Sequence, residues 1–330
     1  MGQPKSVVSS KAVGDRYEGE TEVWKVIDEL GSLLEKDRRL VDSDSRSPDF
    51  FICGAAKSGT TSLFNYLGQH PQIFTPKWKE PGYFSALRPL KSPAQYACLF
   101  EEAEESQIVG EASGAYLTSP DSAARIAQVA PQAKIIIMLR NPAERAFSLY
   151  RWMTCEGYEW IPTFHRALQE ESRRRGNVDF IKSNPEYYYN FLYRTTGCYA
   201  PQIAHFLDYF GREQVRFFIF EDFAEHPGAY TKKAFRFLGL RDSIAVETPV
   251  RNRGKDVLSV RLQYWLRQKG SFAEYFPLGS RASKRAMRLN TVQRNRRLDQ
   301  HTRERLLKFY EEDILRAGEV IGRDLRSLWL

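Results

Sequence analysis

The chain has 330 residues, of which 42% are hydrophobic and 27% are charged, and its formal net charge is +8. This length and composition predict one large globular domain with a short extension. No apolar run approaches the roughly 18–20 residues that cross a bilayer, and the N-terminus has no apolar core typical of a signal peptide. We therefore expect no membrane span and a cytoplasmic protein.

Residues 1–47 form the first segment, which we predict to be a leader followed by a helix. The first six residues, MGQPKS, fit the loose myristoylation pattern, but a disordered leader would look the same. Apolar residues recur at helical spacing from Thr21 to Leu40, which predicts a helix there. A charged, Ser-rich stretch follows, and we place the main domain at residues 48–330.

Three apolar segments of the main domain are predicted to be buried strands, and each comes shortly before a helix. The strands are Phe50–Cys53, Lys134–Leu139 and Val215–Phe220, and helices are predicted at Thr60–Gln69, from Ser119 to about Ala130, from Asn141 onward and at Tyr230–Leu238. Strands that alternate with helices are typical of an α/β fold with a central parallel sheet. The C-terminal part, residues 256–330, is predicted to be mostly helical and basic.

Two helix starts carry capping signals. Ser119 precedes Pro120, an arrangement that suits an N-cap and the first helical turn. Asn141 precedes Pro142, and Glu144 is placed to complete a capping box with Asn141. The second start directly follows a predicted strand, so Arg140 stands at a strand–helix joint.

The four cysteines and five histidines show no metal-binding or redox spacing. Cys53, Cys98, Cys155 and Cys198 form no CxxC pair, which predicts ordinary buried thiols in a reducing compartment. The histidines form no HxxxH or HExxH pattern. We therefore expect no metal site.

The positive charge is concentrated in one segment. Residues from Arg281 to Arg305 include nine Lys or Arg and two Asp or Glu, and the resulting excess of seven is nearly the whole imbalance. This segment could bind nucleic acid, a polyanion or an anionic cofactor, or it could be a solvated helical face. Aromatic residues do not interleave with the charges, so we do not expect nucleic acid as a partner. A polyanionic glycan acceptor could use the same segment.

The most informative stretch is the turn GAAKSGTT, from Gly54 to Thr61, which follows an apolar strand and opens a helix. Backbone N–H groups at such a helix start bind anions. Gly54 and Gly59 keep the spacing of a Walker A loop, but Thr60 stands where that loop has its lysine. The lysine of this chain, Lys57, lies inside the turn. By itself this stretch could still be an ordinary strand–helix connection.

Five motifs occur in a fixed order along the chain: KSGTTSL, KEPGYF, GEASGAYLTSP, IIIMLRNPAERAFSLY and RNRGK. This set resembles the sulfotransferases that use 3′-phosphoadenosine 5′-phosphosulfate (PAPS), and it is most similar to the heparan-sulfate-type branch. The resemblance covers about residues 48–260. It implies a P-loop-like α/β domain with a central parallel sheet, PAPS as the donor, adenosine 3′,5′-bisphosphate (PAP) as the product, and no metal.

The resemblance also implies roles for individual residues. The loop for the 5′-phosphosulfate would consist of Lys57, Ser58, Gly59, Thr60, Thr61 and Ser62. The 3′-phosphate would bind Arg140 and Ser148, a late loop around Arg253 and Gly254 would cover the cofactor, and Glu80 would be the general base. Glu111 and Tyr199 are weaker candidates for the substrate side or for support of the site.

Simple chemistry agrees with these roles but leaves alternatives. An arginine fork suits a compact dianion, and Ser148 lies about two helical turns further on. Lys57 within the turn can point at the bridging oxygen of a leaving phosphate, and Glu80 could take a proton from a hydroxyl. The alternatives are an Arg140–Glu144 ion pair, a Ser148 bonded to its own helix, and a surface Glu80 paired with Lys77 or Lys79.

The acceptor side departs from the family pattern. Gly82 replaces a histidine that often follows the base, and Ala112 replaces a lysine of the next motif. Both changes leave the acceptor undefined. Aromatic residues could line an acceptor cleft or belong to the core: Trp152, Tyr158, Trp160 and residues 187–189.

We therefore expect sulfuryl transfer from PAPS to a hydroxyl of a sugar or small natural product. A first alternative is N-sulfation of an amine or guanidine-type metabolite on the same fold. A second is a P-loop kinase or NTPase, against which count the missing lysine and Arg140 at the strand end where a Walker B aspartate would stand. The sequence leaves the oligomeric state open.

Overall fold

The computed structural model describes residues 46–85, 87, 92–184, 188–249, 254–272, 277–294 and 296–330, with no side chains for 269–281. The leader and the predicted helix Thr21–Leu40 lie outside the described residues. The same is true of Arg253 and of Tyr187. Of the late loop, Gly254 and Lys255 are described.

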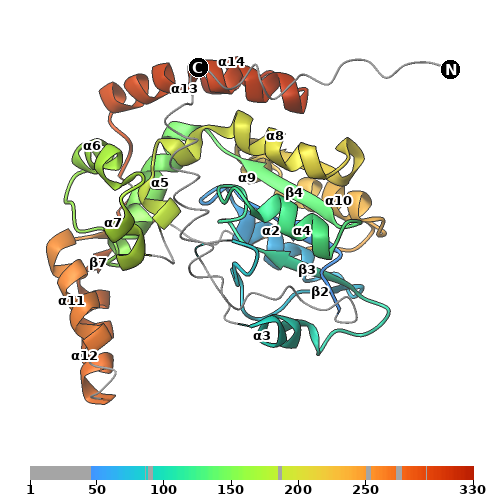
Figure 1. The fold of residues 1–330 in the computed structure, drawn as a ribbon, viewed down its shortest axis with the longest axis horizontal. Coiled ribbons are helices and arrows are strands. Elements are labelled where there is room, and N and C mark those ends of the chain that lie inside the picture. Colours follow the sequence, from blue (N-terminus) through green and yellow to red (C-terminus); the bar gives the residue numbers. More distant parts are fainter. Residues whose placement is uncertain are drawn as a thin grey trace.

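A five-stranded sheet forms the centre of the protein (Figure 1). Its strands are β1 (Phe50–Ile52), β2 (Ile73–Phe74), β3 (Ile108–Ala112), β4 (Lys134–Leu139) and β5 (Val215–Ile219). The order is β2-β3-β1-β4-β5, and all neighbours are parallel. The predicted α/β fold with a central parallel sheet is confirmed. β2 and β3 lie on one side of β1, and β4 and β5 lie on the other, so the carboxyl end of β1 is a topological switch point.

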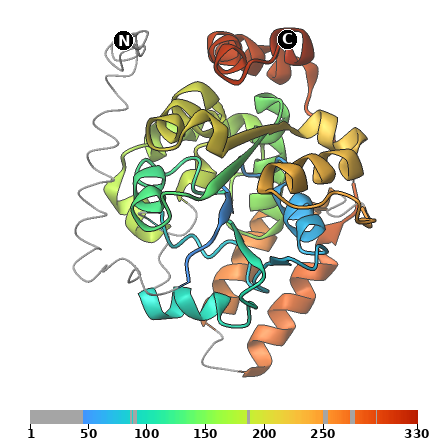
Figure 2. The same ribbon diagram turned by 90° about the vertical axis from the view of Figure 1, so that its right-hand side faces the viewer.

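Successive residues of the strands point to opposite faces, and each face is covered by its own helices. Phe51, Ile135 and Ile137 belong to a core with α4 (Ser122–Val129), α5 (Pro142–Cys155), α8 (Tyr199–Tyr209) and α13 (Gln300–Ile321). Phe50 and Ile136 belong to a second core with α2 (Thr60–Leu67), α9 (Phe220–Glu225) and α10 (Pro227–Leu238). Figure 2 shows the sheet between these two layers. Near-continuous apolar strands are typical of parallel sheets covered on both faces.

Side-chain caps explain some of the helix starts, and three predictions need correction. Asn141 caps α5 as expected, because its Oδ1 accepts from the amides of Ala143 and Glu144 at 3.1 and 3.2 Å. The capping box with Glu144 is wrong, because the Asn141 amide donates to Glu221 instead. α4 begins at Ser122 after Asp121 rather than at Ser119. The strand predicted to end at Phe220 ends at Ile219, because Phe220 begins α9.

The remaining elements surround this core. They are α3 (Pro93–Ala97), η2 (Cys98–Phe100), α6 (Phe164–Arg174), α7 (Val178–Ser183), η3 (Tyr188–Phe191), η4 (Thr195–Gly197) and η5 (Arg212–Gln214). None of the helices in the described ranges is both long and apolar enough to cross a membrane. The four cysteines are free; Cys53 and Cys198 are buried, but Cys98 is exposed at the start of η2, so the prediction of a buried thiol is wrong there.

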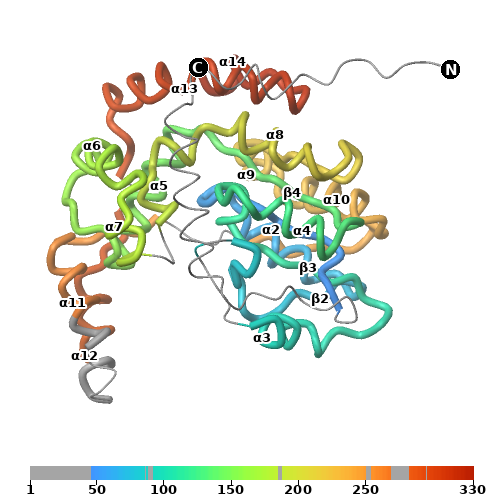
Figure 3. Tube along the Cα trace, in the orientation of Figure 1, coloured from blue at the N-terminus to red at the C-terminus, as the bar shows by residue number. Residues whose placement is uncertain are grey.

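The C-terminal part is mostly helical, as predicted. It contains α11 (Val260–Phe272), α12 (Pro277–Leu289), α13 and α14 (Arg326–Trp329), with a small antiparallel pair β6 (Asp256–Val257) and β7 (Thr291–Val292). Figure 3 shows α11 and α12 side by side, away from the sheet. The basic segment from Arg281 to Arg305 spans the end of α12, β7 and the start of α13, so it is not one helical face.

Candidate active site

A cavity of about 860 Å³ opens at the carboxyl ends of the parallel strands. The segments that follow β1, β3, β4 and β5 all contribute to its walls, together with α5, η3 and the late loop. Open α/β sheets bind ligands at this edge, next to the switch point. The fold therefore places the predicted loop and its partners where a ligand is expected.

The turn between β1 and α2 forms one end of the cavity. Lys57, Gly59, Thr60, Thr61 and Ser62 line it. No side chain caps α2, and the first amides of a helix have no partner within the helix, so these N–H groups remain available to an anion. Gly59 has φ +88°, and a Cβ there would lie 3.1 Å from the Phe220 ring, so glycine is required.

Ser58 is the one member of the predicted loop that does not line the cavity. Its side chain is fully buried, and its Oγ has no hydrogen-bond partner among the residues that the structure describes. Its amide donates to the carbonyl of Ala55 at 3.2 Å. Ser58 is therefore placed in the interior beside the loop and not among the residues that line the cavity.

Lys57 is oriented into the cavity by a backbone with φ 70°. Its Nζ lies 5.6 Å from the centre of the Trp152 ring. Burial lowers the pKa of Lys57 to about 8, and the nearby Glu80 carboxylate offsets part of that decrease. The ammonium is therefore held in a poorly solvated place where it would interact strongly with an anion.

Arg140, which follows β4, contacts the turn between β1 and α2 that contains Lys57. One guanidinium nitrogen donates to the Lys57 carbonyl at 3.1 Å, and the guanidinium lies 4.6 Å from the centre of the Phe220 ring. Ser148, on α5, lines the same cavity. The alternative ion pair with Glu144 does not form; Glu144 lies 3.6 Å from Arg303. Burial lowers the pKa of Arg140, which remains charged.

Tyr199 supports Arg140 from behind and does not line the cavity. It is fully buried, and its hydroxyl donates to the Arg140 carbonyl at 2.8 Å. Its amide donates to Asp313 at 2.6 Å. The structure therefore places Tyr199 among the supporting residues, and it gives no direct contact with a substrate.

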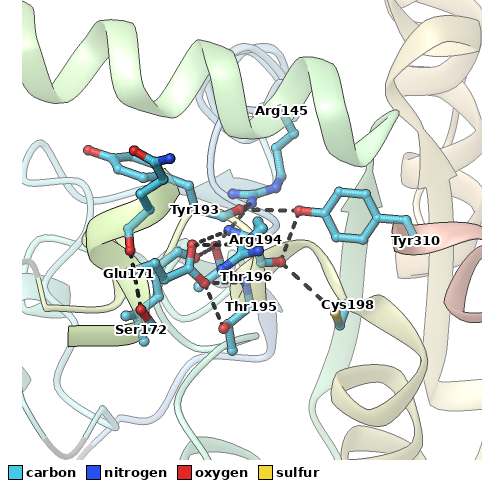
Figure 4. A network of polar contacts seen from close by, with 11 residues as sticks. Arg145, Glu171, Ser172, Tyr193, Arg194, Thr195, Thr196, Cys198 and Tyr310 are labelled. Carbon is cyan, nitrogen blue, oxygen red and sulfur yellow. Dashed lines mark hydrogen bonds and ion pairs between the residues drawn. The ribbon is translucent and has the colours of Figure 1, made fainter. Parts of the chain in front are cut away.

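A buried polar network fixes the segment that leads into Tyr199 (Figure 4). Arg145 donates to the Tyr193 carbonyl at 2.7 Å and to Thr196 Oγ1 at 3.0 Å. Glu171 accepts from the amide of Arg194 at 2.7 Å, and the Tyr310 hydroxyl donates to the Arg194 carbonyl at 2.9 Å. Because α5, α6 and α13 all contribute, the start of α8 is held rigidly.

Glu80 also lines the cavity. Its carboxylate lies 2.5 Å from Lys79 Nζ, so the predicted ion pair with Lys79 exists, whereas Lys77 pairs with Glu102. The φ of Glu80 is 63°, which a residue before proline rarely adopts. Among the described residues other than glycine, only Lys57 and Glu80 have a positive φ. Such strain concentrates at functional sites.

Glu111 lies behind the wall that carries Glu80. The carboxylate is fully buried and accepts from the hydroxyls of Ser113, Tyr96 and Tyr116 at 2.6, 2.7 and 2.9 Å. Burial raises its pKa to about 7, and these hydrogen bonds limit the increase. Ser113 in turn accepts from the Gly82 amide at 3.0 Å. Glu111 therefore holds the turn after Glu80 and does not reach a substrate itself.

The remaining wall combines aromatic, charged and polar side chains. Of the predicted aromatic residues, Trp152 and Tyr189 line the cavity, whereas Tyr158 packs under Arg267 and Trp160 lies outside. Sequence reasoning did not place several other lining residues in the site, among them Lys79, Arg151, Cys155, Glu156, Asn190, Phe220 and Gln293. Helical spacing after Ser148 could have indicated Arg151 and Cys155, because residues three, four and seven apart share a face of α5.

The late loop reaches the cavity through Gly254 and Lys255. Arg151 donates to the carbonyl of Lys255 at 2.9 Å and to that of Arg294 at 2.6 Å, which ties the loop to α5. A Cβ on Gly254 would lie 3.0 Å from the Arg151 guanidinium. Gly254 is thus close to the predicted site, and Arg253 lies outside the described residues.

These residues fit a ligand with two separate anionic groups. Lys57 and the uncapped amides of α2 form one anion site, and Arg140 with Ser148 forms another in the same cavity. Phe220 and Trp152 provide apolar surface there. No cluster of three or more metal-ligating side chains occurs in the ranges that the structure describes.

Comparisons with known proteins agree with this geometry. The sequence model of the sulfotransferase domain family matches residues 47–259. A sulfotransferase from Alicyclobacillus acidocaldarius has a crystal structure that is 31% identical with a TM-score of 0.66, over 86% of this chain and 99% of that one.

Two curated relatives match parts of the chain. Human heparan sulfate glucosamine 3-O-sulfotransferase 3A1 is 29% identical over 61% of this chain and 47% of its own length. The membrane-associated sulfotransferase kil1 of Dictyostelium discoideum is 38% identical over 32% of this chain and 23% of its own length. The matches thus span less than half of each of these relatives. They confirm the predicted family, near its heparan-sulfate branch.

Proposed function

Because the chain belongs to the sulfotransferase family, we propose that it transfers a sulfuryl group from PAPS to a hydroxyl of a sugar or a small molecule. One observation carries this proposal. A single cavity is lined by Lys57 and the start of α2, by Arg140 with Ser148, and by Glu80. These groups match the leaving phosphate, the 3′-phosphate and the acceptor hydroxyl of such a reaction.

The donor contributes an activated sulfuryl group attached to a 5′-phosphate. On this proposal Lys57 and the amides of Thr60 and Thr61 bind that phosphate and stabilise the charge that develops on it. Arg140 and Ser148 bind the 3′-phosphate, so the nucleotide is fixed at two points. As in phosphoryl transfer, the contribution of the protein is mainly positioning and charge stabilisation.

Glu80 is the proposed general base. Its carboxylate faces the cavity near Lys57, and it could accept the proton of an acceptor hydroxyl as the oxygen attacks sulfur. The backbone hydrogen bond from the Glu80 amide to the Ala112 carbonyl, at 3.0 Å, and the buried Glu111 network fix this turn to β3. The base would thus be held by the sheet although it lies on a loop.

The acceptor is proposed to be a sugar or another ring-containing molecule. Trp152 lies next to Lys57 and offers an aromatic face on which a ring can stack, and Tyr189 lines the same cavity. The human relative is named for a glucosamine unit of heparan sulfate, which supports a glycan. Lys79 and Lys255 could pair with acidic groups on such a chain.

One observation favours the alternative of an amine or guanidine-type acceptor. The Glu156 carboxylate lines the cavity and makes no hydrogen bond or ion pair within the described part of the chain, although it is close enough to influence Lys57. A carboxylate beside Trp152 suits a cationic group. Glu156→Gln would selectively weaken a cationic acceptor, whereas a neutral sugar acceptor would be little affected.

The kinase or NTPase alternative has less support. Arg140 directly follows β4, where a Walker B aspartate would stand, and Lys57 lies in the turn before α2. The family match also extends over both phosphate-type motifs.

An acceptor screen by mass tests the proposed function. The protein is incubated with PAPS and pools of glycans, phenols, alcohols and amines, and products that gain one SO₃ group are sought. We expect such a product with wild type and with Lys77→Ala, whose side chain is exposed and pairs with Glu102 outside the cavity. Turnover of ATP without any use of PAPS would refute the proposal.

A further inference from the structure

The joint between β4 and α5, which carries Arg140, is held from behind by a second layer of residues. The amide of Asn141 donates to Glu221 Oε1 at 3.0 Å. The side-chain amide of Asn141 donates to the backbone carbonyl of Trp329 at 3.3 Å. The turn is therefore connected to α9 and to the last helix of the chain.

Glu221 and Trp329 also contact each other. The indole Nε1–H of Trp329 donates to Glu221 Oε2 at 3.3 Å, so one carboxylate accepts from both the turn and the C-terminal helix. Trp329 is only 1% exposed, and its ring lies 6.1 Å from that of Tyr199. A buried indole usually has a partner for its N–H, and here that partner also holds the Arg140 turn.

Two residues that contact Arg140, Phe220 and Tyr199, each adjoin one member of the Glu221–Trp329 pair. Phe220, which packs against the guanidinium, directly precedes Glu221. Tyr199, which binds the Arg140 carbonyl, packs against Trp329. The carboxyl ends of β4 and β5 are thus joined through Glu221, and Trp329 closes this contact from the end of the chain.

We propose that Glu221 and Trp329 are positioning residues that hold the Arg140 fork in the orientation that binds the 3′-phosphate of the donor. Neither residue lines the cavity, so both act through Arg140. α14 lies beyond residues 47–259, the part that the family model matches, so the C-terminal helix completes a site formed by that part. This inference rests on the proposed function.

Because Glu221 is charged, its repulsion of the phosphate and its positioning of Arg140 predict opposite changes in PAP affinity when the charge is removed. A carboxylate near a phosphate site repels the phosphate, so removal of the charge alone would strengthen binding. Glutamine cannot accept through its amide nitrogen, so Glu221→Gln keeps at most one of the two hydrogen bonds. If positioning dominates, Glu221→Gln weakens binding despite the lost repulsion.

The experiment compares PAP with adenosine 5′-phosphate, which lacks the 3′-phosphate, by isothermal titration. The variants are Glu221→Gln, Trp329→Phe and their combination. Trp329→Phe retains an aromatic ring in the core and removes the N–H. Leu328→Ala is the matched control, because Leu328 is on the same helix and 37% exposed. Thermal unfolding is measured for every variant.

We expect each single variant to bind PAP about five- to tenfold more weakly, the range for a lost buried hydrogen bond, with unchanged affinity for adenosine 5′-phosphate. The double variant should lose less than the product of the two single losses, because both changes act on the same hydrogen-bonded pair. Leu328→Ala should bind as wild type does. A general loss of stability would weaken both ligands alike, whereas a positioning role changes their ratio.

Two other results would overturn the inference and have different meanings. If wild type prefers PAP and the variants retain that preference undiminished, Glu221 and Trp329 do not position Arg140. If wild type shows no preference for PAP, the 3′-phosphate site at Arg140 is itself wrong, and the proposed function fails with it.

Discussion

The proposed donor half of the cavity, formed around Lys57 and Arg140, is built on the ends of strands, whereas the proposed acceptor half is built on loops and helix ends. Lys57 and Arg140 follow β1 and β4 within a few residues, and each precedes a helix. Glu80, Glu156, Tyr189 and Lys255 come from four separate segments. The first half is therefore set by the sheet and should bind one fixed ligand, while the second can vary without disturbing the fold.

The largest expected effect is the loss of Lys57 from the donor half. Lys57→Ala removes the side chain that is proposed to stabilise charge on the leaving phosphate, so we expect kcat/KM to fall about 10³-fold or more. Steady-state rates with PAPS measure this, with Lys77→Ala as the control. A rate near that of wild type would show that the turn does not serve the leaving group.

Glu80→Gln separates the two halves. The amide cannot accept a proton, so we expect kcat to fall about 10²-fold or more. Well below pH 8, where Lys57 keeps its charge without Glu80, the affinity for PAP should not decrease, because Arg140 and the loop are intact. Single-turnover rates and titration with PAP measure the two quantities. If PAP affinity falls together with kcat, Glu80 belongs to the donor half and the division is incorrect.

Arg140→Lys tests the second anion site of the donor half. A lysine cannot form the planar fork, so the preference for PAP over adenosine 5′-phosphate should fall about tenfold or more. Ser148→Ala should cause a smaller loss of the same preference, since it removes one hydrogen bond. Competition binding with both nucleotides gives these ratios. An unaltered ratio in both variants would place the 3′-phosphate elsewhere.

The pKa of Lys57 predicts a pH effect confined to the donor half. Burial lowers this pKa to about 8, so the ammonium loses its proton as the pH rises through that value. PAP binds the charged form, so PAP affinity should decrease above pH 8, by at most about tenfold per unit for one proton. Lys57→Arg remains charged and should flatten the profile. A flat profile in wild type would contradict the assignment.

Local sequence was sufficient for the donor half because its geometry is local. The strand Lys134–Leu139, the Asn141 cap and the turn with Lys57 depend on neighbouring residues, and the structure places all of them as predicted. The roles of Lys57, Arg140 and Ser148 remain predictions, although the structure brings these residues into one cavity. Ser58 is buried instead of lining it, which a motif alone does not reveal.

Contacts between distant segments could not be predicted. The expected capping box fails because Glu221, and not Glu144, receives the Asn141 amide. Asn141 and Trp329 are 188 residues apart in the sequence. Glu111 and Tyr199 carry polar groups that suggest substrate contact, but tertiary packing buries both behind the wall. The acceptor half combines segments of this kind, so its specificity is not evident from any one motif.

A crystal structure with bound PAP tests the central claim most directly. The account predicts the 5′-phosphate at Lys57 and the first amides of α2, the 3′-phosphate within hydrogen-bond distance of Arg140 and Ser148, and Glu80 facing the side of the 5′-phosphate where an acceptor would enter. PAP bound in the reverse orientation would contradict it. So would PAP bound instead in the smaller basic cavity near Arg216 and Lys233 at the edge of β5.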